Sequence, residues 1–340
     1  YTTESMQSDH SARNHTGLLI LFAASNDGTD ANGDGEVDLD SMGSPATAKN
    51  VLTVGASENN RPWINSAWGT GPSPSGAVYS SPISVDLVAN NTEGMAAFSS
   101  RGPTDDGRLK PDVSAPGTFI LSTKSRSTSQ TGWGAHSNSD YTYMGGTSMA
   151  TPITAGAAAL LYQHLIDNLA HTTPSSALVK GIISASAHDM TGQYGSSTNG
   201  AGETAPNNHE GWGLLDLDRA VNTSWVDDES VSTGDTRSWK FTVPANASDL
   251  KVMVSWTAPA STPAASTNLV NDIDFAVKDP NGTWSSHGNN LDNLIGTSIS
   301  SPMAGQWEIH VNGTNIPSGP QKFAMIIDAP YNLINTSADA

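Results

Sequence analysis

The residues with the clearest potential for chemistry lie in one stretch, residues 143–152, whose sequence is YMGGTSMATP. Its two glycines carry no Cβ, so the backbone there can turn tightly and approach a substrate closely. The run that follows, residues 149–162, is rich in Ala and Leu and almost uncharged. This pattern predicts a buried helix that begins here, with Thr147 or Ser148 as its N-cap.

A serine at the start of a buried helix has two possible roles. Its Oγ lies near unpaired backbone N–H groups and the positive end of the helix dipole, where a nucleophile and a developing oxyanion are both stabilised. The same position suits a serine that only caps the helix, which is the commoner use. From its position alone, Ser148 is compatible with both roles.

Residues 146–152 (GTSMATP) resemble the nucleophile motif of the subtilases, Gly-Thr-Ser-Met-Ala-x-Pro, at every fixed position. A chance match to six fixed positions in a chain of 340 residues is rare. The resemblance implies a serine endopeptidase in which Ser148 attacks the scissile carbonyl of a protein or peptide substrate. It also implies that the Ser148 N–H, assisted by the Thr147 hydroxyl, holds the oxyanion.

A second candidate follows the apolar run of residues 17–25, which predicts a parallel strand buried on both faces. Asn26 ends this run, and sites in open α/β sheets lie at the carboxyl ends of strands. Taken alone, Asn26 is better explained as a turn residue that ends the strand. The segment resembles the Ala-Ala-Gly-Asn strand end of subtilases, where the Asn side chain donates to the oxyanion.

The same resemblance assigns a primary specificity pocket. It places Ala24 and Ser25 on the pocket floor, although subtilases usually carry Gly where this chain has Ser25. It also assigns the loop at Ser44 and Pro45 to the pocket wall, and predicts that the Ser44–Pro45 peptide bond is cis.

An acidic segment directly after Asn26 predicts a calcium site. Its spacing, D-x-N-x-D-G-x-x-D, reproduces the first nine positions of a calcium loop, although Ser41 stands where a complete EF-hand has Glu. The candidate ligands are Asp30, Asn32, Asp34, Glu36 and Asp38. A solvated acidic loop is the alternative. Asp272 and Asp274, on one side of a predicted strand, are a second pair of candidates, with strand-end hydrogen bonding as the alternative.

Composition narrows the class of protein. The chain has 33 acidic and 15 basic residues, a net charge of −18, which argues against nucleic-acid or anionic-membrane partners. The excess fits an exported protein, cation binding or a salty habitat. Cysteine is absent, so there is no disulfide and no cysteine nucleophile. No apolar run approaches the length of about 20 residues that a membrane helix needs. We expect an extracellular protein with Ca²⁺ as cofactor.

Other segments also resemble subtilases. Residues 95–103 and 110–117 match Phe-Ser-Ser-x-Gly and Lys-Pro-Asp-Val-x-Ala-Pro-Gly elements. Asp112 lies in this packing motif, so we expect it to pair with Lys110 or Arg101, or to cap a turn, rather than to act as a catalytic acid. Further along, residues 51–56 predict another buried strand, 57–95 a long loop and 175–187 an amphipathic helix, and a Gly-Trp-Gly element at 211–213 resembles the one that closes subtilase catalytic domains.

The predicted fold class is α/β with an added all-β unit. Residues 1–225 are expected to form the C-terminal portion of a subtilisin-like catalytic domain with a doubly wound parallel sheet. Residues 227–329 show period-two alternation and Asn-Gly turns, which predict an antiparallel β-sandwich, and 330–340 form a tail. The sandwich resembles the jelly-roll module of alkaline, calcium-binding subtilases related to oxidatively stable Bacillus enzymes.

Two expected motifs are missing. Subtilases carry an Asp in an Asp-Thr/Ser-Gly turn and a His in a His-Gly-Thr-His helix start, and neither occurs in this sequence. We therefore expect the base and the orienting acid to come from an upstream segment of the catalytic domain. The alternatives are a non-catalytic subtilase-like scaffold and a calcium-dependent binding module. An esterase or lipase is disfavoured because Gly-x-Ser-x-Gly is absent around Ser148.

Overall fold

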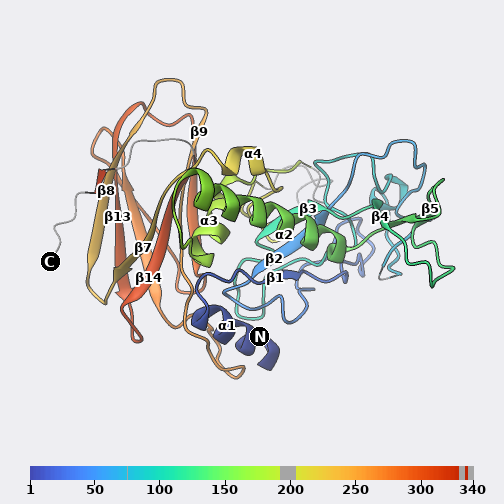
Figure 1. Ribbon diagram of the computed structural model, residues 1–340, viewed down its shortest axis with the longest axis horizontal. Helices are drawn as coiled ribbons and strands as arrows, with labels where there is room; N and C mark the ends of the chain where they lie inside the picture. Colours follow the sequence, from blue (N-terminus) through green and yellow to red (C-terminus); the bar gives the residue numbers. More distant parts are fainter. Residues whose placement is uncertain (75, 192–203, 329–333, 336–340) are drawn as a thin grey trace.

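The computed structural model describes residues 1–74, 76–191, 204–328 and 334–335. Helices, loops and small sheets make up the first part of the chain, and antiparallel strands make up the second (Figure 1). The helices are α1 (Thr3–Asn14), α2 (Thr147–Gln163), which continues as a π-helical turn η2 (His164–Asn168), α3 (Ser176–Ser186) and α4 (Leu217–Ala220). None of the described helices has the length and apolarity of a membrane span.

Three parallel strands form the sheet of the first part, in the order β1 (Leu21–Ala23), β2 (Leu52–Ser57) and β3 (Val113–Pro116). Every residue of the central strand β2 is buried, as its apolar sequence predicts. All three residues of β1 are only half-buried, so the predicted burial on both faces is wrong there. The reason is that β1 is an edge strand, with β2 as its one described partner.

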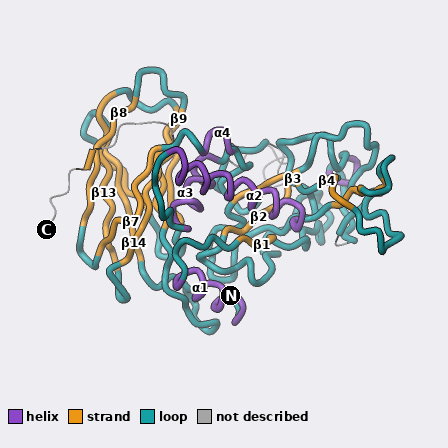
Figure 2. Tube along the Cα trace, viewed as in Figure 1, coloured by secondary structure: helices purple, strands orange, loops and turns teal. Residues whose placement is uncertain are grey.

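The connection between β2 and β3 is mostly loop, as predicted for residues 57–95, apart from a short 3₁₀ turn η1 (Ile83–Val85) (Figure 2). After β3 the chain forms a small antiparallel sheet in the order β4-β6-β5, in which β6 leads directly into α2. Its strands are β4 (Ile120–Thr123), β5 (Gly134–Ala135) and β6 (Tyr141–Met144).

Helix α2 begins as predicted near Ser148, but two details of the prediction are wrong. Its N-cap is Gly146, with φ 141°, and no side chain caps the helix. Thr147 is already the first helical residue, and its hydroxyl donates to the Ser25 carbonyl and to Asn26, which follow β1. The helix is also not buried all round: Leu160 is 57% exposed, so α2 covers the sheet with one face only.

Helix α3 is more deeply buried than its amphipathic sequence predicts, since all eleven residues are buried. Its N-cap is Ser175, whose side chain accepts a hydrogen bond from the Leu178 N–H. The second face is covered by strand β14 of the C-terminal part. A Cβ on Gly181 would lie 2.3 Å from Cδ1 of Ile326, so the absence of a side chain here lets Ile326 of the sheet pack directly on the helix backbone.

The C-terminal strands form two antiparallel sheets, in the orders β11-β10-β13-β8-β15 and β12-β9-β14-β7. Large side chains from both sheets share one hydrophobic core, among them Trp239, Phe275 and Phe323. The strands are β7 (Ser224–Val231), β8 (Thr236–Val243), β9 (Asp249–Ser255), β10 (Asp272–Lys278), β11 (Trp284–His287), β12 (Leu294–Ser300), β13 (Gly305–Asn315), β14 (Gln321–Asp328) and β15 (Ile334–Asn335). In β10 buried and half-buried residues alternate, as the period-two pattern predicts.

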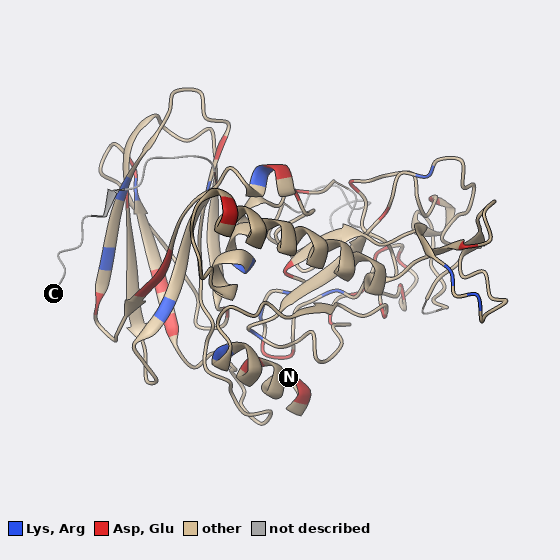
Figure 3. Cartoon of the chain, viewed as in Figure 1, with Lys and Arg blue, Asp and Glu red and all other residues tan. Residues whose placement is uncertain are grey.

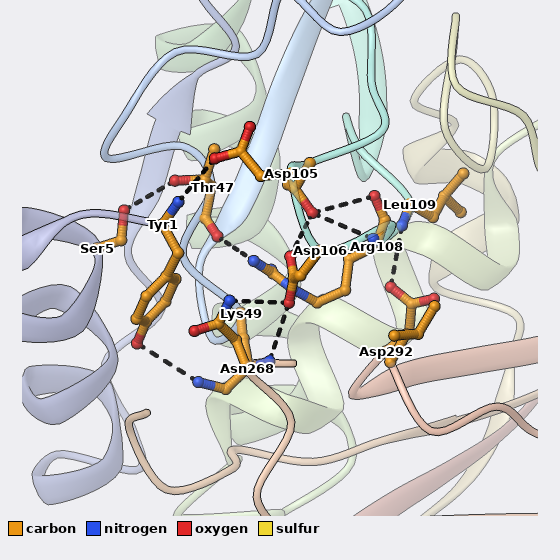
Figure 4. Close-up of polar contacts among 12 residues, drawn as sticks. Tyr1, Ser5, Thr47, Lys49, Asp105, Asp106, Arg108, Leu109, Asn268 and Asp292 are labelled. Atoms are coloured by element: carbon orange, nitrogen blue, oxygen red, sulfur yellow. Dashed lines mark hydrogen bonds and ion pairs between the residues drawn. The ribbon is translucent and has the colours of Figure 1, made fainter. Parts of the chain in front are cut away.

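A buried polar network joins the two parts of the chain (Figure 4). Asp106 accepts hydrogen bonds from Arg108 on its own loop and from Asn268 in the C-terminal part, at 2.9 Å each. Burial alone would raise the pKa of Asp106, but the hydrogen bond and charge of Arg108 outweigh it and hold this pKa below its usual value. The Leu109 N–H donates to Asp292 at 3.1 Å, which adds a second link.

Candidate active site

Ser148 lies in the first turn of α2, and its side chain is exposed. The Gly146 N–H, just before the helix, donates to the Gly117 carbonyl, and the Gly117 N–H donates to the Ser57 carbonyl, both at 2.8 Å. Ser57 ends β2, and Gly117 directly follows β3. These bonds hold the start of the helix at the carboxyl ends of the parallel strands, where sites in open α/β sheets are found.

Asn26, which follows β1, is fixed against the same turn. Its Oδ1 accepts from the Thr147 N–H at 2.8 Å and from the Thr147 hydroxyl at 3.1 Å. Because a backbone N–H can only donate, this contact defines which end of the amide is oxygen. The Nδ2 group makes no hydrogen bond to any residue that the structure describes, and Asn26 is half-buried, so two N–H donors remain available.

Besides the amide group of Asn26, the backbone N–H of Ser148 is an available donor. It has no acceptor among the described residues, as is usual in the first turn of a helix. A site near this N–H and the Asn26 amide can stabilise negative charge on a substrate oxygen. The Thr147 hydroxyl, predicted as an oxyanion donor or support, bonds to the Ser25 carbonyl and to Asn26. It therefore positions Asn26.

The predicted pocket residues lie together. Ala24 is buried, and its carbonyl accepts from the Gly43 N–H at 3.2 Å, which holds the 43–45 loop beside it. The peptide bond between Ser44 and Pro45 is cis, which confirms the prediction. The Ser44 hydroxyl bonds to Thr2 and Ser5 of the N-terminal helix.

Ser25 is the unusual residue of this pocket. Its φ is 94°, a conformation that strains a residue with a Cβ. Its Cβ lies 2.9 Å from the position that a Cβ on Gly43 would take, so these two residues face each other closely. Its hydroxyl donates to Asp27 at 2.5 Å. A Cβ and a hydroxyl therefore occupy space that glycine would leave empty.

The acidic loop folds around Asp30, which is 6% exposed. Oδ2 of Asp30 accepts from the backbone N–H groups of Gly35 and Ser80, while its Oδ1 is buried without a partner. Oδ2 of Asp38 accepts from the Ala31 N–H at 2.7 Å. Asn32, Asp34 and Glu36 form a turn within the loop. Among the residues described, no three His, Cys, Asp or Glu side chains lie grouped together in the way that metal ligands do.

The second acidic pair lies on the C-terminal sheet. The pKa of Asp272 is raised to about 6 by burial and by the charge of Asp274, and its Oδ1 is buried without a partner. Asp274 accepts a hydrogen bond from the Thr314 hydroxyl at 2.6 Å.

No described histidine bonds to Ser148. His171 pairs with Asp227 and His188 with Glu93, far along the chain from the nucleophile turn. His209 accepts from Arg101, and burial together with that charge lowers the pKa of His209 to about 3. These three histidines are paired with other residues, and no side chain of the described residues is hydrogen-bonded to Ser148.

Asp112 is structural, as predicted. Its carboxylate bonds to Lys110 at 2.6 Å and also to Lys180 of α3 at 3.0 Å, a partner that the sequence did not reveal. Arg101, the other predicted partner, bonds instead to His209.

Trp133 lies beside the nucleophile turn and was not predicted from the sequence. A Cβ on Gly145 would lie 2.2 Å from the Trp133 ring, so this ring lies flat on the turn before Ser148. Trp133 also packs edge-on against Phe98 and Phe119. No motif or spacing marked it, because the contact depends on the path of the β4-β6-β5 sheet.

A serine in the first turn of a helix, with two N–H donors beside it, is typical of serine hydrolases that form an oxyanion hole. The sequence model of the Subtilase family matches residues 2–213, and the chain belongs to this family. Its relatives include proteins described as serine proteases.

The chain is 30% identical over 308 residues to the serine protease/ABC transporter B family protein tagB of Dictyostelium discoideum, covering 69% of this chain and 16% of that protein. It is 34% identical over 149 residues to serine protease AprX of Bacillus subtilis, covering 43% of this chain and 26% of that protein. The chain thus spans a small part of these relatives. The crystal structure of a lanthipeptide protease aligns with a TM-score of 0.39 and 18% identity, covering 64% of this chain and 54% of that one.

Proposed function

We propose that this chain carries the nucleophile part of a secreted serine endopeptidase. The observation that supports this most is the arrangement of Asn26, whose Oδ1 is occupied by Thr147 so that its N–H donors remain available beside Ser148. Membership of the Subtilase family gives this arrangement its chemical context.

In the proposed reaction, the Ser148 Oγ attacks the carbonyl carbon of a peptide bond and passes its proton to a base. The carbonyl oxygen takes up the negative charge and is held by the Ser148 N–H and the Asn26 amide. The C–N bond then breaks, the leaving amine takes the proton, and an acyl-enzyme forms on Ser148. Water, deprotonated by the same base, hydrolyses the ester and releases the acid.

The base and its orienting acid are proposed to come from a polypeptide segment outside these 340 residues. Two observations support this: no described histidine bonds to Ser148, and β1 presents an edge without a described neighbour. Backbone groups on such an edge can pair with an added strand. Asn26 lies three residues after the end of β1, so a strand added in parallel to this edge would end near the nucleophile.

Calcium is proposed to bind the acidic loop, with Asp30 as the central ligand. The support is the Asp30 Oδ1, a buried carboxylate oxygen without a partner, in a loop whose oxygen donors are the type that Ca²⁺ prefers. Thermal unfolding in Ca²⁺ and in EGTA tests this, with Asp30→Asn compared with Asp105→Asn, whose side chain is 85% exposed. Ca²⁺ should raise Tm in the native protein and in the Asp105 variant only. An equal rise in both variants contradicts the proposal.

The activity is tested with a fluorogenic protein substrate. The protein is isolated together with any polypeptides that co-purify with it, and the rate of hydrolysis is measured. Hydrolysis that is lost in Ser148→Ala, with folding unchanged, supports a peptidase. Equal activity of the native protein and this variant excludes Ser148 as the nucleophile. Complete inactivity of the native protein favours the second candidate, a non-catalytic subtilase-like scaffold, which the absence of a described base supports.

A further inference from the structure

Arg61 differs from the other arginines of the chain. Among the residues that the structure describes, each of the other six donates at least one side-chain hydrogen bond, whereas Arg61 donates none and has no carboxylate within 4.0 Å. Its Nε is buried without a partner. The chain has 33 acidic residues, which are spread over both parts of the molecule (Figure 3). An arginine without a carboxylate partner is therefore unexpected in this protein.

Aromatic rings hold the Arg61 guanidinium in place. Its central carbon lies 5.6 Å from the ring centroid of Trp63 and 5.9 Å from that of Tyr143. Arginine stacks well on aromatic faces, and a stacked guanidinium keeps its N–H groups free for in-plane hydrogen bonds. Arg61 is therefore fixed by contacts that leave its hydrogen-bonding capacity unused.

The surroundings of Arg61 are exposed and aromatic. Trp63 is 67% exposed, and Tyr141 is 39% exposed. Tyr141 and Tyr143 lie on the same face of β6, and the His136 ring lies about 6 Å from both, at 5.9 and 6.1 Å. We call Arg61, Trp63, His136, Tyr141 and Tyr143 the Arg61 patch. Exposed aromatic side chains grouped in this way are typical of a binding surface.

The Arg61 patch lies near the nucleophile. Strand β6 ends at Met144, and Tyr143 is five residues before Ser148, a span of at most about 18 Å of extended chain. Trp133 connects the Arg61 patch with the nucleophile turn. Its backbone N–H donates to the Tyr143 carbonyl at 2.8 Å, and its ring covers Gly145. A peptide several residues long that is bound at Ser148 can reach the patch.

We propose that the Arg61 patch is a subsite that binds an acidic side chain of the peptide substrate. The guanidinium would take the Asp or Glu carboxylate through two N–H groups, while Trp63 and Tyr143 shield the pair from water. A single unpaired arginine suits one carboxylate, not a polyanion. The protein has a net charge of −18. Against this negative charge, the positive charge of Arg61 would also determine which residue of an acidic substrate binds at the patch. This inference rests on the proposed peptidase function.

The test is a binding measurement. Fluorescein-labelled peptide pools of random sequence, with Glu or Gln fixed at one position, are titrated with the native protein, Arg61→Gln, Arg61→Lys and Arg126→Gln, and fluorescence anisotropy is recorded. Arg126 is the matched control because it lies in the same β4–β6 region, is 86% exposed and pairs with Asp140.

We expect the native protein and the Arg126 variant to bind the best Glu pool about tenfold more tightly than the matching Gln pool. Arg61→Gln should abolish this preference, and Arg61→Lys should retain part of it, since the charge remains but the planar fork is lost. Equal binding of the Glu and Gln pools by the native protein overturns the proposal, as does an equal loss in the Arg61 and Arg126 variants.

This experiment separates the subsite from the activity. If Ser148 proves inert but the Glu preference depends on Arg61, the peptidase proposal fails and the binding site stands. If the protein is an active peptidase without this preference, only the subsite is refuted.

Discussion

Replacing Asp112 by Asn should severely destabilise the protein. The Asp112 side chain is buried and accepts from Lys110, Lys180 and the Thr53 N–H, at 2.6, 3.0 and 2.7 Å. Burial alone would raise the pKa of Asp112, but the two lysine charges outweigh it and lower this pKa. The amide removes the carboxylate that is paired with both buried lysines. Burial already lowers the pKa of Lys110 to about 7, so without this carboxylate Lys110 loses its proton while Lys180 loses its partner charge. Breaking a buried ion pair in this way typically costs about 3–5 kcal/mol.

Such a loss is large against a total stability of about 5–15 kcal/mol. With an m-value of about 3 kcal/mol/M, a loss of about 4 kcal/mol lowers the urea midpoint by about 1.3 M. Asp140→Asn is the control: its pair with Arg126 is exposed, so the expected cost is under about 1 kcal/mol, or about 0.3 M.

The assay is urea unfolding followed by far-UV circular dichroism, combined with fluorophosphonate labelling of Ser148 in the absence of urea. If the urea midpoint of Asp112→Asn differs from that of the native protein by no more than the midpoint of Asp140→Asn does, the structural role of Asp112 is refuted. Loss of labelling in a variant of native stability would instead identify Asp112 as part of the catalytic machinery.

Three further results are expected. Ser25→Gly should raise Tm, because φ 94° costs about 1–3 kcal/mol in a residue with a Cβ and this exceeds the entropic cost of glycine; a lower Tm would contradict it. Gly145→Ala should lower Tm and reduce labelling of Ser148, because its Cβ would clash with Trp133; unchanged labelling would show that the turn tolerates displacement. In EGTA, Asp272→Asn should raise Tm at pH 7 but not at pH 3.5. The pKa of Asp272 is about 6 in the folded protein, above its value in the unfolded chain, so native stability falls as pH rises from about 4 to 6.

Local sequence predicted the elements with strong local signals. The nucleophile turn, the buried strand β2, the cis bond at Pro45 and the pairing of Asp112 with Lys110 all follow from short motifs. The strand and the pairing depend on residues close together in the chain, so pattern and propensity were sufficient for them. The nucleophile role of the turn and the cis bond were instead predicted from the resemblance to subtilases.

Contacts over long sequence separations were not predictable in this way. The N-cap of α2 is Gly146, and Thr147, the first helical residue, donates its N–H and its hydroxyl to Asn26, 121 residues away. The burial of α3 depends on the C-terminal sheet, and the place of Trp133 depends on the path of the β4-β6-β5 sheet. Such positions are decided by packing between elements, which composition and periodicity do not specify.

The central claim, that Ser148 is the nucleophile of a peptidase completed by another segment, is tested most directly with a fluorophosphonate probe. The purified material is labelled and its intact masses are read under denaturing conditions, with Ser148→Ala as control. We expect a label on Ser148 that is lost in the variant, together with a second polypeptide that carries the Asp and His motifs. An unlabelled 35.3 kDa species alone would contradict this claim.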